Sequence, residues 1–196
     1  MDQQNIDKII TNYLSKNIVF SEENLFATKL SLLDTLGCIY NASTYEDPMR
    51  FASRDVYGAN TNPFKVLEDI KSSNEIARYF SILTRWFDYN DTFLAKEWAH
   101  PSDNIGTALG FFINHKEKNF SVFLQSIIQM YEIQGCLALG TSLNKRGYDH
   151  VFYVKLASGA VFSSLLSDQN YESISRTVNN ILQDGLNLRS YRQAPN

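Results

Sequence analysis

The polar segment RWFDYNDTFLAKEWAHPSDN, at residues 85–104, is the part of this sequence best supplied with side chains for chemistry. Those side chains are Asp88, Asp91, Thr92, Glu97 and His100. They follow a stretch with the apolar spacing of an amphipathic helix, and loops that a scaffold positions often carry function. Imidazole gains and loses protons near neutral pH, so the segment indicates general acid–base chemistry.

His100 is predicted to stand just before the start of a helix. Pro101 disfavours helical backbone geometry at His100, and Ser102-Asp103 can cap a helix that begins near Asn104. The positive end of a helix dipole favours a neutral imidazole, which is the form that a general base needs.

A second histidine has the same predicted setting. In KRGYDHV, Asp149 can cap a helix that begins near His150. Two such imidazoles can share acid and base work, although a lone histidine more often only caps or packs at a helix end. We give that structural interpretation to His115, in NHKEKN.

Other chemistries have less support. Asp88, Asp91 and His100 are hard-cation ligands in type, but no close metal-binding spacing is present, so we expect neither a metal nor another cofactor. Asp88 and Asp91 can equally be surface carboxylates. Cys38 and Cys136 lie in apolar segments with helical spacing, which predicts buried free thiols.

The 196 residues have an ordinary globular composition, with 44% hydrophobic residues and a net charge of −3. Scattered charges give no basic field for nucleic acid or an anionic membrane. The amino terminus has no signal-like pattern, and no apolar run approaches the roughly 18 residues of a membrane span. We therefore expect a cytoplasmic protein without nucleic-acid or membrane partners.

Apolar residues with helical spacing predict an all-α, single-domain protein over residues 1–196. Ile6–Leu14 and Phe26–Leu36 open the chain, and residues 40–63 look irregular. Later helices are predicted at 76–87, 104–113, 120–139, 150–166 and 171–185. The small residues Ala157-Ser158-Gly159-Ala160 predict close approach of a neighbouring helix.

Five sequence blocks, taken in order, resemble the MmgE/PrpD family. They are LLDTLGC at 32–38, RWFDYNDTFLAKEWAHPSDNIG at 85–106, YEIQGCLAL at 131–139, GYDHVFYVKLAS at 147–158 and LRSYRQAPN at 188–196. The longer blocks resemble the family's methylcitrate branch. Residues 41–75 do not match, and the family also includes cis-aconitate decarboxylase and iminodisuccinate epimerase.

This resemblance implies an all-helical lyase that removes water from 2-methylcitrate to give 2-methyl-cis-aconitate. The reaction belongs to propionate breakdown by the methylcitrate cycle and uses no iron–sulfur cluster. Carried over to this chain, the family's catalytic residues are Asp88, Thr92, His100 and His150. The resemblance does not divide the acid and base roles between the two histidines.

The implied substrate is a small tricarboxylate, which needs local cations because the chain as a whole is acidic. We expect Arg189 and Arg192 to bind its carboxylates, with Asp91 and Lys155 also at the binding site. Arg85 and Lys96 are lesser candidates, and solvated helix-end charge is an equally good interpretation of the cations.

The resemblance covers only the amino-terminal part of the family's length. The expected continuation carries a further basic residue, more helices and an α+β lid, so we expect this chain alone to be weakly active or inactive. A homo-oligomer or a complementary chain would complete it. The alternatives are a non-catalytic helical binding or assembly module, and a sibling tricarboxylate activity such as aconitate hydration or decarboxylation.

Overall fold

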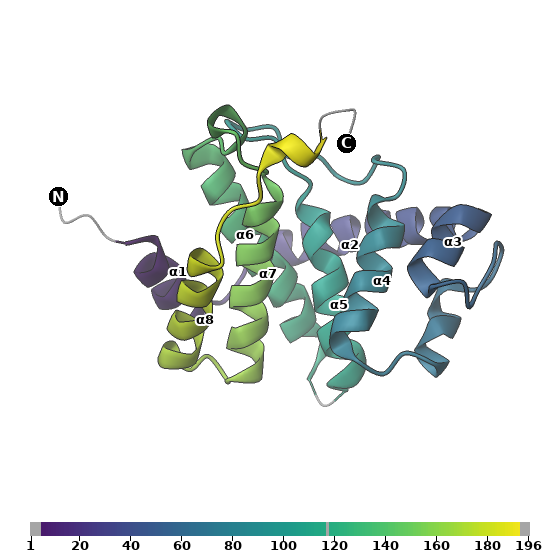
Figure 1. The fold of residues 1–196 in the computed structure, drawn as a ribbon. Helices are drawn as coiled ribbons and strands as arrows, with labels where there is room; N and C mark the ends of the chain where they lie inside the picture. The colour runs from purple at the N-terminus through teal and green to yellow at the C-terminus, as the bar shows by residue number, and fades with distance from the viewer. Residues whose placement is uncertain (1–4, 117, 193–196) are drawn as a thin grey trace. The chain divides into compact units, whose positions relative to one another are not determined.

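A computed structural model describes residues 5–116 and 118–192 of the chain (Figure 1). Its α-helices are α1 Ile6–Leu14, α2 Glu22–Ser43, α3 Glu46–Ser53, α4 Ser73–Arg85, α5 Ile105–Asn114, α6 Phe120–Gly140, α7 Val151–Leu166 and α8 Tyr171–Gln183. Its 3-10 helices are η1 Pro63–Glu68, η2 Pro101–Asn104, η3 Asn144–Arg146 and η4 Arg189–Arg192. These residues form no strand beyond two isolated bridges, so the all-α prediction is confirmed.

The predicted helices appear close to their expected bounds, with two differences. The prediction of an irregular stretch over residues 40–63 is wrong in part, because α2 continues to Ser43 and α3 occupies Glu46–Ser53. Pro48 interrupts the sequence pattern there, but it falls in the first turn of α3, where a helix does not need its missing N–H. The helix predicted to reach Phe87 instead ends at Arg85.

The described chain divides into two compact units. Among the described residues, unit 1 comprises residues 5–19, 93–99 and 129–192, and unit 2 comprises residues 20–92, 100–116 and 118–128. The boundary crosses α6, whose first part belongs to unit 2 and whose second part belongs to unit 1. Whether the chain is a single domain stays a prediction.

The core of unit 2 lies where α2, α3 and α4 pack together. Its fully buried members include Ile39, Met49, Tyr79 and Phe80. Burying a side chain of this size stabilises a fold by roughly 1.5–3 kcal/mol, so these contacts hold the segment after α4 in place.

Two glycines bring α5 against α4, and Figure 1 shows these helices side by side. A Cβ atom at Gly106 would lie 2.8 Å from the Ala77 carbonyl oxygen, and one at Gly110 would lie 2.4 Å from the Ser73 carbonyl oxygen. Real Cβ atoms do not approach so closely. The absence of both side chains therefore sets the distance between these helices.

In unit 1, α1, α7 and α8 pack on one another. The Ser164 hydroxyl of α7 donates to the Leu14 carbonyl of α1 at 3.2 Å. A Cβ atom at Gly159 would lie 2.4 Å from Ile181 Cδ1, which confirms the predicted close approach at the small residues of α7.

Among the described residues, α6 is long and apolar enough to cross a membrane by length and composition alone. This finding qualifies the expectation that no segment comes near a membrane span. However, 56% of its most apolar window is buried within the protein, as in the core helix of a globular protein. The helix is therefore weak evidence for a span.

We predict that Gly110→Ala destabilises unit 2. The added methyl group meets backbone atoms of α4, which cannot rotate away, so the free energy of unfolding should fall by about 1–3 kcal/mol in urea titrations. Gly37→Ala is the matched control, because a methyl group added to Gly37 in α2 would have no atom within 4 Å. The control should be neutral or stabilising by up to ~1 kcal/mol. Equal effects of both substitutions would contradict the packing account.

Candidate active site

Asp91 fixes the segment that follows α4 in unit 2. Its backbone carbonyl accepts a hydrogen bond from Nδ1 of His100 at 2.7 Å. Its carboxylate accepts the backbone N–H of Ser102 at 2.9 Å. One residue thus ties the beginning of the segment to the first turn of η2, with His100 immediately before that turn.

The bond to Asp91 also selects the tautomer of His100. A carbonyl oxygen can only accept, so Nδ1 carries the proton in the neutral ring and Nε2 presents a lone pair. Nε2 lies 3.8 Å from Oδ1 of Asp88. The His100 side chain is only 5% exposed, whereas the Asp88 side chain is 67% exposed. This arrangement suits a general base whose protonated form faces a carboxylate.

Asp88 occupies an unusual backbone conformation. Its φ of 61° lies in the left-handed region, which aspartate and asparagine adopt more readily than other residues with a side chain. Arg85, at the end of α4, forms an ion pair with the Asp88 carboxylate. This ion pair helps to hold the turn at Asp88 that follows α4.

A buried polar network supports this geometry. The side-chain amide of Asn90 donates to the Ser102 hydroxyl at 2.7 Å and to Asp103 Oδ1 at 3.2 Å. Arg85 Nε lies 3.7 Å from the same Asp103 oxygen. The prediction that Ser102-Asp103 caps α5 is wrong: Asn104 is the residue before α5, and its side chain makes no capping hydrogen bond. Asp103 serves the network instead.

Burial raises the pKa of Asp103 from 3.8 to about 6, although Arg85, His100 and Asn90 act in the opposite direction. Loss of water around a carboxylate penalises its charged form. The carboxyl is therefore costly to ionise in the folded protein, even beside a guanidinium.

Thr92 and Glu97, two polar residues of the segment 85–104, do not contribute to the hydrogen bonds that position His100. Thr92 is exposed and lies next to Asp91 in the chain. Glu97 belongs to unit 1, where its buried carboxylate accepts hydrogen bonds from the Ser142 hydroxyl and the Asn144 backbone at 2.9 and 2.7 Å. Glu97 therefore holds a turn rather than taking part in the histidine site.

His150 lies in unit 1, at the amino-terminal end of α7, and is buried. The Asp149 carboxylate accepts the Val151 N–H at 3.0 Å, which confirms the predicted cap, and lies 3.5 Å from His150 Nδ1. The Trp98 ring packs against the imidazole with centroids 5.0 Å apart. This is a second buried histidine beside an aspartate.

The predicted substrate-binding cations differ in their surroundings. Arg189 donates its backbone N–H to the Gly147 carbonyl at 2.9 Å, and its Nη1 is buried without a hydrogen bond to the described part of the protein. Lys155 forms an ion pair with Asp184. The Arg192 side chain lies outside the described residues. Arg189 is thus the cation best placed to take a new partner.

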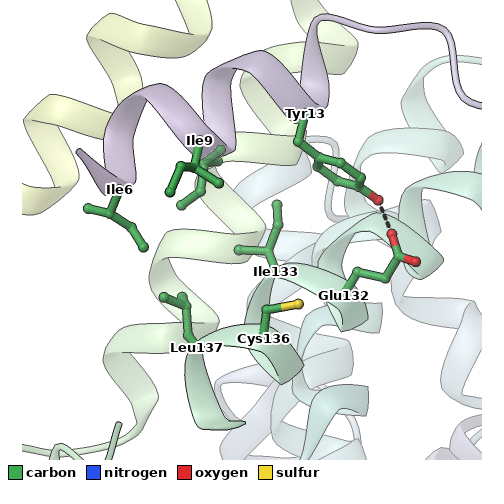
Figure 2. Close-up of a pocket in the computed structure, with 8 residues that line it drawn as sticks. Ile6, Ile9, Tyr13, Glu132, Ile133, Cys136 and Leu137 are labelled. Carbon is green, nitrogen blue, oxygen red and sulfur yellow. Dashed lines mark hydrogen bonds between the residues drawn. The ribbon is translucent and has the colours of Figure 1, made fainter. Parts of the chain in front are cut away.

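A separate apolar groove lies in unit 1 between α1 and α6 (Figure 2). Its volume is about 480 Å³, and Tyr13 donates to Glu132 at its edge. It contains none of the candidate catalytic residues. Cys136 lines it and is exposed, so the prediction of two buried thiols holds only for Cys38. An apolar sequence context did not distinguish a core position from a groove wall.

His115 and the grouping of possible metal ligands were the remaining predictions from the sequence. The His115 ring stacks on Phe111 with centroids 4.1 Å apart, in agreement with a structural role. Within residues 5–116 and 118–192, no three histidine, cysteine or acidic side chains are grouped closely enough to hold a metal ion. Of the predicted site residues, Asp88, Asp91, Thr92 and His100 lie in unit 2, whereas His150, Lys155 and Arg189 lie in unit 1.

The helical fold agrees with the family comparison. Residues 10–196 match the MmgE/PrpD N-terminal domain, and the chain belongs to this family. The 2-methylcitrate dehydratase of Cupriavidus necator is 36% identical, over 100% of this chain and 42% of its own length. The probable 2-methylcitrate dehydratase of Saccharomyces cerevisiae is 34% identical, over 100% of this chain and 41% of its own length. The mitochondrial 2-methylcitrate dehydratase of Yarrowia lipolytica is 35% identical, over 98% of this chain and 40% of its own length. The chain thus spans about two fifths of these relatives' length.

We predict that Asp103→Asn changes the pH dependence of stability. Because the folded-state pKa of Asp103 is raised from 3.8 to about 6, its contribution is most favourable below pH ~4 and is lost as pH rises through ~6. Relative to Asp103→Asn, the wild-type free energy of unfolding should therefore fall over this window, by on the order of 2–3 kcal/mol. Urea titrations at several pH values measure the difference. Two curves that stay parallel would contradict the burial of this carboxyl.

Proposed function

We propose that this chain contributes the acid–base side chains of a hydro-lyase that converts 2-methylcitrate to 2-methyl-cis-aconitate. The observation that carries the proposal is the His100 geometry, with Nδ1 held by the Asp91 carbonyl and Nε2 directed at Asp88. Membership of the family and the names of three relatives support the lyase class and suggest the substrate.

The proposed reaction needs one base and one acid. The base removes a proton from a carbon next to a carboxylate, a carbon–carbon double bond forms, and the hydroxyl on the neighbouring carbon leaves with a second proton as water. His100 and His150 are the proposed proton carriers, and either can take either role. Asp88 faces the protonated form of His100, and Thr92 is proposed to bind the departing hydroxyl.

Substrate binding requires cations for three carboxylates. Arg189 is the leading candidate because its Nη1 is buried and makes no hydrogen bond to the described residues. Leaving such a group without a partner costs about 1–3 kcal/mol, which a substrate carboxylate would recover. Arg192 is proposed beside it. Lys155 would have to exchange Asp184 for substrate, and Asp91 is proposed to position His100 in addition to any substrate contact.

The relatives are longer than the part that this chain matches, so the proposed site includes side chains from outside this chain. We propose that a second chain, or further copies of this one, completes the site. A cytoplasmic location also stays a proposal, since the name of one relative places that protein in mitochondria.

The test measures formation of 2-methyl-cis-aconitate by ultraviolet absorbance after a chelator wash. The chain is assayed alone and mixed with a polypeptide carrying the remaining part of the Cupriavidus necator relative. We expect activity in the mixture, and loss of at least ~100-fold with His100→Ala or His150→Ala, as for removal of a general acid or base. His115→Ala, which removes a ring stacked on Phe111, is the matched control and should retain turnover.

Circular dichroism separates chemistry from folding in this test. Both catalytic variants should keep wild-type helicity, because each replaces one side chain at a helix end. Variants that unfold while their folded fraction turns over normally would show that the histidines are structural. Equal turnover of aconitate or another tricarboxylate would shift the proposal to a sibling activity.

A further inference from the structure

The Arg85 guanidinium lies between two carboxylates of unit 2. It forms an ion pair with Asp88, and its Nε lies 3.7 Å from Oδ1 of Asp103. Its Nη1 also donates to the side-chain oxygen of Asn90 at 3.3 Å. A guanidinium carries five N–H donors in a rigid plane, so it can bind partners on two sides at once. Arg85 thus connects an aspartate just after α4 with an aspartate in η2.

The two carboxylates differ in how firmly they are held. The Asp103 side chain is 14% exposed, and its Oδ1 also accepts a hydrogen bond from the Asn90 amide at 3.2 Å. The Asp88 side chain is far more exposed and lies in the turn that follows α4. An exposed side chain keeps rotamer freedom unless a partner restricts it. Asp103 is therefore the fixed end of this bridge, and Asp88 is the end that has to be held.

The Asp88 atom that Arg85 contacts is also the atom that faces the histidine. Arg85 Nη1 donates to Oδ1 of Asp88, and Nε2 of His100 lies 3.8 Å from the same oxygen. The imidazole is held on its other side by the Asp91 carbonyl, so the ring cannot follow a moving carboxylate. The distance between the two groups therefore depends on the rotamer of Asp88, and the contact with Arg85 selects that rotamer.

We propose that Arg85 is a positioning residue of the hydro-lyase site, which holds the Asp88 carboxylate against Nε2 of His100. Asp103 anchors the guanidinium on its other side. The catalytic meaning of this inference rests on the proposed function, and it gives Arg85 a role other than binding substrate. A guanidinium that already faces two carboxylates has less charge to offer a third. Arg85 therefore acts on proton transfer, through Asp88, and not on substrate affinity.

Carboxyl-carbon NMR of Asp103 tests the fixed end of the bridge in the chain alone. Burial raises the pKa of Asp103 to about 6, and Arg85, His100 and Asn90 act in the opposite direction. We expect Arg85→Gln to raise this pKa further, by roughly 1, because a nearby opposite charge is lost. An unchanged pKa would show that Asp103 does not anchor Arg85 and would overturn the proposal.

Asp88→Asn tests whether the two carboxylates share the guanidinium. Asparagine also tolerates the left-handed conformation of this position, so the turn should be kept. Loss of the Asp88 charge leaves Arg85 to Asp103 alone. The pKa of Asp103 should therefore fall by roughly 0.5, and by less than half as much in an Arg85→Gln background. Equal decreases in both backgrounds would mean that the carboxylates only repel each other directly, which would overturn the bridge.

Arg78 is the matched control on the same helix. Its Nη1 donates to the Ala52 carbonyl at 2.9 Å, so this arginine of α4 joins two helices of unit 2. Arg78→Gln should lower the free energy of unfolding in urea titrations and leave the pKa of Asp103 unchanged. If Arg78→Gln raised this pKa as much as Arg85→Gln does, the effect would be one of general destabilisation, and the proposal would fail.

The kinetic test uses the mixture with the remaining part of the Cupriavidus necator relative. Arg85→Gln should lower kcat at least ~10-fold and leave KM within about threefold, because proton transfer is impaired and binding is not. This loss should not add to that of Asp88→Asn, since Arg85 acts through that carboxylate. A raised KM with unchanged kcat, or additive losses, would overturn the positioning role. An inactive wild-type mixture would contradict the proposed function, while the Asp103 titrations would still decide whether Arg85 bridges the two carboxylates.

Discussion

The hydrogen bond from His100 Nδ1 to the Asp91 carbonyl is the contact on which the candidate site in unit 2 depends. It orients the buried ring, selects the tautomer and directs Nε2 towards Asp88. The second bond of Asp91, from Ser102 N–H, keeps the two ends of the segment together. Without these bonds, His100 would be an ordinary buried histidine at a helix end, which is the structural alternative that the sequence left open.

Two groups in this site are unfavourable by themselves, and the packing around them offsets their cost. Asp103 is buried enough to have a raised pKa, and Asp88 takes a left-handed backbone conformation. The close contact of α4 and α5 at Gly106 and Gly110 fixes the two helix ends that flank the segment. Functional sites commonly keep such unfavourable groups where rigid elements enforce them.

Much of the helical fold follows from the sequence, because apolar periodicity reports helices directly. The positions of His100 and His150 were predictable too, since Pro101 and Asp149 act locally. Long-range contacts could not be predicted from the sequence. Glu97 has the side chain of a site residue, but its carboxylate accepts hydrogen bonds from Ser142 and Asn144 instead. The periodicity of Phe26, Leu30 and Leu33 predicted a helix correctly, but it could not show which face of α2 the core would cover. Gly106-x-x-x-Gly110 was the available signal for close helix packing.

Nitrogen-15 NMR of the His100 ring reports which ring nitrogen the Asp91 carbonyl holds. The two ring nitrogens differ strongly in chemical shift depending on which one is protonated, and the measurement needs no substrate or second chain. At a pH where the ring is neutral, we expect a protonated Nδ1 and an unprotonated Nε2. The opposite tautomer, or a rapidly exchanging mixture of both, would contradict this hydrogen bond, because the Asp91 carbonyl can hold only a ring that donates from Nδ1.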